Sequence, residues 1–201
     1  MRLMVDLFSG LGGASKVFKQ AGWEVITVDI NPDFSPDLCM DVRDFLSVWD
    51  GRKPDFLWAS PPCIEFSKSS MPWYSFKKPE WWAMELVFET LKIVHALEPK
   101  LWILENVRGA QKWIGKAPFH AGSFYLWGYF PFESLKRKLP RNSPSLSGKN
   151  KLFPSEDRAA KRAEIPELLS RAVLLTVEEC LGQKKAITGG KELPLLQGVL
   201  E

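Results

Sequence analysis

Hydrophobic residues fall into short runs that alternate with helical patterns over the first half of the chain. An apolar run at 3–8 is followed by a glycine turn, a helical pattern over 14–20 and a second apolar run at 24–29. Two further short runs, 55–59 and 101–104, flank a segment in which apolar residues recur every three or four positions. Short apolar runs bounded by turn residues predict buried strands, and the three-four spacing predicts a helix.

Strands joined through helices predict a mostly parallel sheet with helices on both faces, because such crossovers are right-handed. We therefore expect an α/β, doubly wound fold of the Rossmann-like type over the first 110 residues or so. Beyond Asn106 the pattern weakens: 122–130 predicts an aromatic strand or hairpin arm, 166–181 a helix, and the last twenty residues a weakly structured tail. The organisation expected is an α/β domain over 1–120, a small basic and aromatic region over 121–157, and a C-terminal helix and tail over 158–201 that pack back on the first domain.

Composition narrows the class of protein. The chain has 201 residues, of which 45% are hydrophobic and 25% charged, as in ordinary globular domains. Its three cysteines are widely spaced and lack the spacing of a zinc site or a disulfide framework, so no metal is expected. No run approaches the roughly 18 apolar residues of a membrane span, and a reduced cytoplasmic location is the expectation.

Charge is distributed unevenly along the chain. The net charge of +3 is too small to indicate a nucleic-acid partner by itself. However, the stretch 134–155 holds six basic residues and no acidic one, among them Arg137 and Arg141. This pattern is typical of a solvated loop or of a segment that contacts phosphates, and both interpretations stay open.

The turn after the first strand, with Gly10, Gly12 and Gly13, suggests a nucleotide loop. It is not a dinucleotide fingerprint, since Ser15 stands where a third glycine is needed, and it lacks the Gly-Lys-Ser/Thr of a P-loop. Asp29 closes the second strand and is placed to accept hydrogen bonds from ribose hydroxyls. These features predict an adenosine-like ligand, with Asp41 in the next loop as a candidate for facing the adenine. A helix cap or turn role is the alternative for each aspartate.

A possible nucleophile follows the third strand of the pattern. Pro61 and Pro62 fix two backbone φ angles ahead of Cys63, at the strand end where open α/β sheets bind ligands. Glu105 ends the next strand, where burial would raise its pKa and let it share a proton near neutrality. Neighbouring parallel strands bring Cys63 and Glu105 to one sheet edge. Taken alone, Cys63 is more readily explained as an inert buried cysteine beside a structural proline turn.

In this order the motifs resemble the DNA (cytosine-5) methyltransferase family. The resemblance covers roughly residues 1–110 and rests on Asp6-Leu7-Phe8-Ser9-Gly10-Leu11-Gly12-Gly13, Asp29, Asp41-Val42, Ser60-Pro61-Pro62-Cys63 with Phe66-Ser67, and Glu105-Asn106-Val107.

The resemblance implies S-adenosylmethionine as methyl donor and a flipped-out cytosine as acceptor. Cys63 would add to C6 of the base, Glu105 would act at N3, and Asn106 would brace the loop of Cys63. The aromatic, Lys- and Ser-rich segment 68–78 would close on the base. The implied cofactor-binding residues are Asp6, Phe8, which would stack near the adenine, Gly10, Gly12, Gly13, Asp29, Ile30, Asp41, Val42 and Pro61. The substrate-binding candidates are Ser67, Lys68, Arg137 and Arg141.

Three departures from the family pattern shape the expectation. Ile64 stands where the family usually has Gln, no Gln-x-Arg-x-Arg follows Glu105-Asn106-Val107, and little room remains for a large target-recognition domain. We therefore expect a compact, monomeric DNA cytosine-5 methyltransferase with a reduced C-terminal recognition region, encoded by a prokaryote, virus or phage as in restriction-modification systems, with relaxed specificity as a secondary hypothesis. The alternatives are the same chemistry on tRNA or another RNA, and a catalytically idle module that binds DNA or a partner methyltransferase.

Overall fold

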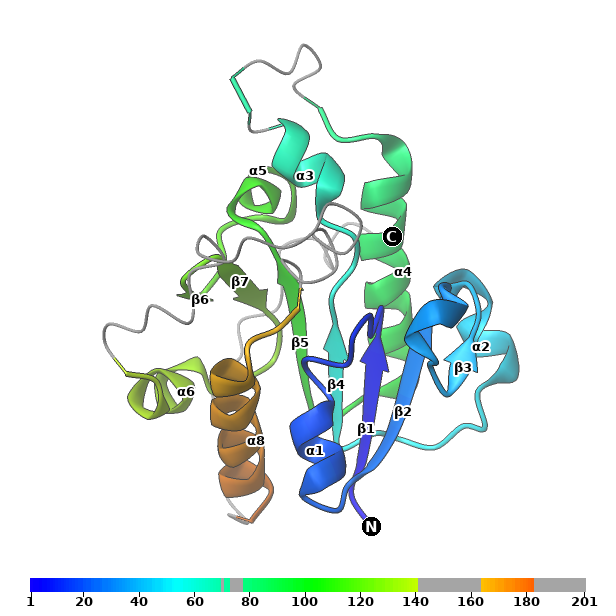
Figure 1. Ribbon diagram of the computed structural model, residues 1–201, viewed down its shortest axis with the longest axis vertical. Helices are drawn as coiled ribbons and strands as arrows, with labels where there is room; N and C mark the ends of the chain where they lie inside the picture. The colour runs from blue at the N-terminus through cyan, green and yellow to red at the C-terminus, as the bar shows by residue number, and fades with distance from the viewer. Residues whose placement is uncertain (70, 73–77, 141–163, 183–201) are drawn as a thin grey trace.

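The computed structural model describes residues 1–69, 71–72, 78–140 and 164–182 of the chain. Within these residues the strands form one seven-stranded sheet in the order β3-β2-β1-β4-β5-β7-β6 (Figure 1). β1, β2, β3, β4 and β5 pair in parallel, whereas β7 pairs antiparallel with β5 and with β6. The strands are β1 (Leu3–Leu7), β2 (Glu24–Asp29), β3 (Leu38–Cys39), β4 (Phe56–Ala59), β5 (Leu101–Asn106), β6 (Phe119–Ala121) and β7 (Phe124–Trp127).

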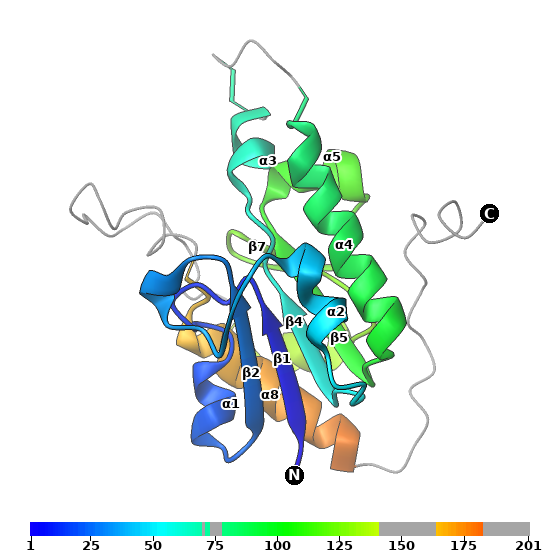
Figure 2. The same cartoon turned by 90° about the vertical axis from the view of Figure 1, so that its right-hand side faces the viewer.

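Helices cover both faces of this sheet, and each face has its own apolar core. On one face, α1 and α8 pack with α6 over side chains such as Phe56, Trp58 and Ile103. On the other, α2 and α4 pack over alternate positions of the same strands, such as Leu57 and Leu104. Figure 2 shows α4 and α8 on opposite sides of the strands. The helices are α1 (Lys16–Gln20), α2 (Phe45–Val48), α3 (Ile64–Ser69), α4 (Trp81–Leu97), α5 (Gln111–Ile114), α6 (Phe132–Lys138) and α8 (Glu167–Gly182), with 3-10 turns η1 (Pro32–Phe34), η2 (Val42–Asp44) and η3 (Arg108–Ala110).

The doubly wound α/β prediction is confirmed, since β1-α1-β2 and β4-α4-β5 are the expected crossover units. The expectation of a closing loop over 68–78 needs a correction at its start, because Lys68 belongs to α3 rather than to a loop. The first residues of the basic stretch are likewise helical, in α6, which the sequence pattern did not predict. The rest of that stretch, from 141 on, lies outside the described residues, as does the tail 183–201.

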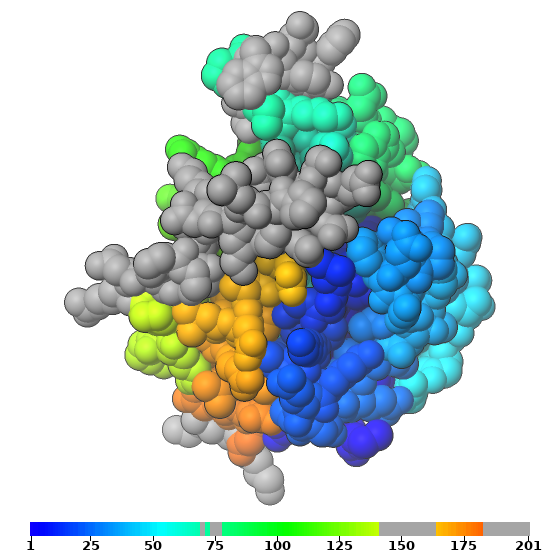
Figure 3. All heavy atoms as spheres, viewed as in Figure 1, coloured from blue at the N-terminus to red at the C-terminus, as the bar shows by residue number. Residues whose placement is uncertain are grey.

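The C-terminal helix lies against the glycine turn that follows β1. The hydroxyl of Ser170 on α8 donates to the carbonyl oxygen of Gly13 at 2.6 Å. A Cβ at Gly13 would come within 2.7 Å of the backbone N and O of Ile165, so only glycine fits there. Figure 3 shows the orange residues of this segment packed directly beside the blue N-terminal ones. The two ends of the described chain therefore build one unit around the turn.

Among the described helices, none is both long and apolar enough to cross a membrane.

Candidate active site

The carboxyl ends of β4 and β5 bring Cys63 and Glu105 together. Trp58 pairs with Ile103 and Ala59 with Leu104 in the parallel register, so the chain beyond Ala59 runs beside Glu105. The prolines at 61 and 62 supply no N–H to the ladder, and α3 begins directly after Cys63. Figure 1 shows α3 at the edge of the sheet toward which these strands point. The two residues predicted to carry the chemistry thus share one edge of the sheet.

Asn106, fully buried at the end of β5, joins the two segments. Its Nδ2 donates to the carbonyl oxygen of Pro61 at 3.0 Å, and its Oδ1 accepts from the backbone N–H of Val107 at 2.9 Å. Both halves of the amide are therefore used. The contact fixes the backbone two residues before Cys63 relative to the strand that carries Glu105.

Glu105 is only 8% exposed, and burial raises the pKa of its carboxyl to about 8. Burial removes water that would solvate the carboxylate, so the neutral acid is favoured. A hydrogen bond from the Ser60 hydroxyl opposes this effect by stabilising the charged form. Near neutral pH Glu105 is consequently a protonated acid that can donate a hydrogen bond.

Burial also raises the pKa of the Cys63 thiol, and the charge of Glu105 raises it further, while a hydrogen bond from the Ser67 hydroxyl lowers it. The Glu105 contribution operates only when Glu105 is ionised. Below about pH 8 that carboxyl is neutral, which leaves desolvation as the main factor that disfavours the thiolate. Protonation of Glu105 and ionisation of Cys63 therefore favour each other.

The glycine turn lies at the ends of β1 and β2. Asp29 accepts from the backbone N–H of Gly10 at 2.8 Å through one oxygen and from that of Asn31 at 2.9 Å through the other. Phe8 adopts the left-handed region at φ 60°, which is rare for a residue with a bulky side chain. Strained conformations of this kind gather at functional sites, where the surroundings enforce them.

Asp6 on β1 is a buried carboxyl beside this turn. It is 1% exposed, and its Oδ2 has no hydrogen-bond partner among the described residues. Burial raises its pKa to about 7, with the Asp29 charge acting in the same direction and a hydrogen bond from Ser15 in the opposite one. An unpaired buried acceptor is costly to a fold, so it marks a place where a ligand with donors would be stabilised.

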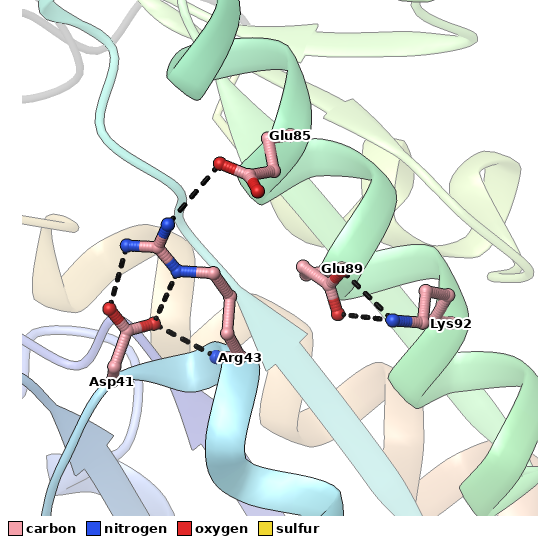
Figure 4. Close-up of polar contacts among 5 residues, drawn as sticks. All are labelled: Asp41, Arg43, Glu85, Glu89 and Lys92. Atoms are coloured by element: carbon pink, nitrogen blue, oxygen red, sulfur yellow. Dashed lines mark hydrogen bonds and ion pairs between the residues drawn. The ribbon is translucent and has the colours of Figure 1, made fainter.

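Asp41 is occupied by protein contacts (Figure 4). It is the N-cap of η2, where its side chain accepts from the backbone N–H of Arg43 at 2.9 Å. Its two oxygens also accept from Nε and Nη2 of the Arg43 guanidinium at 3.0 and 2.8 Å, and Nη1 of Arg43 reaches Glu85 on α4 at 3.3 Å. The structure thus shows Asp41 in the helix-cap role that the sequence analysis gave as its alternative. Its neighbour Val42 is buried, whereas Ile30 is 67% exposed beyond the end of β2.

The predicted substrate residues are divided between two places. Ser67 and Lys68 lie in α3 next to Cys63, and Lys68 pairs with the buried carboxylate of Glu65 at 3.0 Å. Arg137 lies on α6, beside α8 and well away from α3 in Figure 1. Arg141 lies outside the described residues. Of the predicted substrate residues that the structure describes, only Ser67 and Lys68 are near Cys63.

Two groups at the site were not predicted as participants. Trp58 and Ser60 lie two positions apart on β4 and its extension, and the indole N–H of Trp58 donates to Ser60 Oγ at 2.7 Å. The sequence did hold a signal for them. Side chains alternate along a strand, so Trp58 and Ser60 lie on the same face of the sheet as Glu105. In the part of the chain that the structure describes, no group of three or more His, Cys, Asp or Glu residues could hold a metal.

Comparisons with known proteins match the same region. The model of the family described as C-5 cytosine-specific DNA methylase matches residues 3–113. A frog virus 3 protein named "Probable DNA (cytosine-5)-methyltransferase" is 34% identical over 117 residues, covering 53% of this chain and 53% of the relative. The type II methyltransferase M.HgiGI of Herpetosiphon aurantiacus is 32% identical over 122 residues, covering 53% of this chain and 91% of the relative.

Among solved structures, a SAM dependent methyltransferase from Archaeoglobus fulgidus is similar at 22% identity and a TM-score of 0.36, covering 53% of this chain and 45% of that one. The match to the frog virus relative spans about half of that protein's length.

Proposed function

Because the chain belongs to the C-5 cytosine-specific DNA methylase family, we propose that it transfers a methyl group from S-adenosylmethionine to C5 of cytosine in DNA. The observation that supports this most strongly is the pairing of Cys63 with Glu105. A thiol and a carboxyl protonated near neutrality end adjacent parallel strands, and their charges interact. Addition of a nucleophile to a cytosine ring requires such a pair, since the charge that the addition creates must be neutralised on the ring.

The chain's own residues account for activation of the base. The Cys63 thiolate forms a bond to C6, the electron pair of the C5–C6 double bond moves toward C5, and Glu105 donates its proton at N3. Because the neutral form of Glu105 is favoured up to about pH 8, the donor is available at neutral pH. After methyl transfer, a base such as a water molecule takes the C5 proton, the C5–C6 double bond re-forms as the C6–sulfur bond breaks to release the thiolate, and N3 returns its proton to Glu105. Since C5 and C6 lie inside a duplex, the base must first be flipped out.

The glycine turn has the chemistry to hold the cofactor. When bound, S-adenosylmethionine supplies an electrophilic methyl group on its sulfonium sulfur. The oxygens of Asp29 can accept from ribose hydroxyls, and the unpaired Oδ2 of Asp6 offers a buried acceptor for a positively charged or donor group. Phe8, held in its left-handed conformation at the end of β1, would stack near the adenine. Gly10 and Gly12 would let the ligand approach the backbone closely, whereas the space beside Gly13 is filled by the backbone of Ile165.

Methyl transfer from labelled S-adenosylmethionine tests this function directly. Duplex DNA, single-stranded DNA and tRNA are offered in parallel to the parent protein, to Cys63→Ala and to Cys39→Ala, whose cysteine is exposed on β3. We expect incorporation into DNA by the parent and by Cys39→Ala, and none by Cys63→Ala. Incorporation into tRNA alone would assign the same chemistry to RNA. No incorporation into any polymer would overturn the enzymatic proposal and favour an idle binding module.

A further inference from the structure

A line of hydrogen-bond donors leads from the core to Glu105. Trp58 is fully buried on β4, and its indole N–H, which can only donate, binds Ser60 Oγ at 2.7 Å. The Ser60 backbone N–H still donates to the carbonyl oxygen of Leu7 at 3.1 Å, so Ser60 extends the strand rather than belonging to a free loop. Its position is therefore fixed through both its backbone and its side chain.

The direction of the Ser60 hydroxyl follows from this geometry. A hydroxyl has one proton to donate, and because Ser60 Oγ accepts from Trp58, that proton is directed to another acceptor. Glu105, next to Ser60 in the extended register of β4 and β5, is that acceptor. We propose that Ser60 is a positioning residue: held by Trp58, it donates to one carboxyl oxygen of Glu105 and thereby leaves the carboxyl proton on the other oxygen, for the substrate base.

This arrangement matters because a protonated carboxyl can present its single proton in two ways. The carbonyl oxygen of a neutral carboxyl is a stronger hydrogen-bond acceptor than its hydroxyl oxygen, so the oxygen that accepts from Ser60 is the one without the proton. The neighbours of Glu105 offer little competition for its proton. Leu126, opposite Glu105 on β7, is apolar, and the titratable group whose charge interacts with Glu105 is the thiol of Cys63. Ser60 thus selects the proton position that the reaction needs. The role at the substrate base rests on the proposed function, whereas the hydrogen bond to Glu105 does not.

The carbon-13 signal of the Glu105 carboxyl, followed against pH in the full chain without substrate, tests the contact. The signal is assigned by its loss in Glu105→Gln. The parent is expected to titrate with a pKa of about 8. Ser60→Ala removes a donor that stabilises the carboxylate, so the pKa of Glu105 should rise further, by about one pH unit. Ser60→Thr, which keeps the hydroxyl, should restore the parent value.

Two more variants separate loss of the Ser60–Glu105 hydrogen bond from a general loss of stability. Trp58→Phe frees the Ser60 hydroxyl to turn, so we expect a smaller rise in the pKa of Glu105. Ser134→Ala removes another buried serine hydroxyl, one that donates to Glu179 at 3.1 Å between α6 and α8, and should leave the titration of Glu105 unchanged. If Ser60→Ala is poorly folded by thermal melting, Trp58→Phe and Ser60→Thr still decide the matter. A Glu105 titration that coincides in the parent, Ser60→Ala and Trp58→Phe overturns the proposal.

The pH dependence of kcat links the contact to the reaction. In Ser60→Ala the fall in kcat at alkaline pH should move upward with the pKa of Glu105, and kcat near neutrality should fall about tenfold or more because the proton is no longer held on one oxygen. An unchanged kcat profile beside a shifted titration would overturn the positioning role. If the parent transfers no methyl group while the titration shifts as expected, the proposed function fails and the Ser60–Glu105 contact stands.

Discussion

The side-chain amide of Asn106 donates a hydrogen bond to the carbonyl oxygen of Pro61, 3.0 Å away, inside the core. This contact holds the approach to Cys63 against the strand of Glu105. Asn106→Ala would leave the buried Pro61 carbonyl and the partly buried Val107 N–H without the partners that Asn106 supplies. We expect the free energy of unfolding to fall by about 3 kcal/mol. Methyl transfer should fall about 100-fold, because small displacements of a nucleophile are costly.

Thr176→Val is the control for lost stability alone. It removes a buried hydroxyl that donates to the Ala172 carbonyl within α8, far from Cys63. Chemical denaturation and single-turnover methyl transfer at saturating cofactor measure the two effects. An Asn106→Ala protein that loses no more activity than Thr176→Val would show that the contact serves stability only.

The buried acids predict how stability depends on pH. Burial raises the pKa of Asp6 from 3.8 to about 7 and that of Glu105 from 4.5 to about 8 in the folded protein. Between its ordinary pKa and its raised pKa, each of these carboxyls is protonated in the folded state and ionised in the unfolded state. The free energy of unfolding therefore falls as pH rises, by about 1.4 kcal/mol per pH unit for each group. We expect Glu105→Gln to show a shallower decline between pH 5 and pH 8, and Asp6→Asn a shallower decline between pH 4 and pH 7.

Urea denaturation at half-unit pH intervals measures these slopes. Glu133→Gln, an exposed acid in the first turn of α6, is the matched control and should keep the parent slope. A parent stability that is flat or rises from pH 5 to pH 8, with no difference in Glu105→Gln, would mean that Glu105 is ionised in the folded protein at neutral pH.

Close packing at Gly13 predicts a steric effect on the proposed cofactor site. In Gly13→Ala the new Cβ would lie 2.7 Å from the Ile165 backbone and force the segment before α8 away from the turn. We expect a loss of about 2 kcal/mol in stability and weaker binding of S-adenosylmethionine. Ser170→Ala should cost about 1 kcal/mol by removing the bond to the Gly13 carbonyl.

Gly182→Ala, where nothing lies within 4 Å of the new Cβ, provides the comparison and should change neither property. Thermal melting and calorimetric titration with S-adenosylhomocysteine give both readouts. Parent-like binding in Gly13→Ala would show that α8 does not shape the proposed cofactor site.

Asp41 and Arg43 can be separated by single substitutions. Asp41→Ala removes the cap of η2 and should cost about 1 kcal/mol, whereas Arg43→Ala breaks an exposed ion pair and should change stability little. If Asp41 also contacts the adenine, only Asp41→Ala should weaken cofactor binding, by about tenfold. Equal affinities of the two variants in calorimetric titration would limit Asp41 to its role as a cap.

The crossover units were predictable because buried strands and amphipathic helices carry their period in the sequence. Glu105 and Cys63 could be placed at one edge because each follows an apolar run. The hydrogen bond of Asn106 to Pro61 has no local pattern that gives its distance, and the approach of Ile165 to Gly13 joins residues more than 150 positions apart. Contacts of that range depend on how the layers pack. Likewise, the residues of α6 favour a helix, but the segment is only seven residues long and lies between Pro131 and Pro140, so that the helix depends on its contacts with α8.

A covalent bond between Cys63 and a cytosine is the central claim, and trapping on DNA that contains 5-fluorocytosine measures it most directly. Fluorine at C5 cannot leave as a proton does, so the sulfur–C6 bond should persist after methyl transfer. We predict a denaturation-resistant complex that requires S-adenosylmethionine, appears with the parent and with Cys39→Ala, and maps to the peptide of Cys63. A complex of equal yield in Cys63→Ala, or no complex with a parent protein that methylates ordinary cytosine in DNA, would contradict the account.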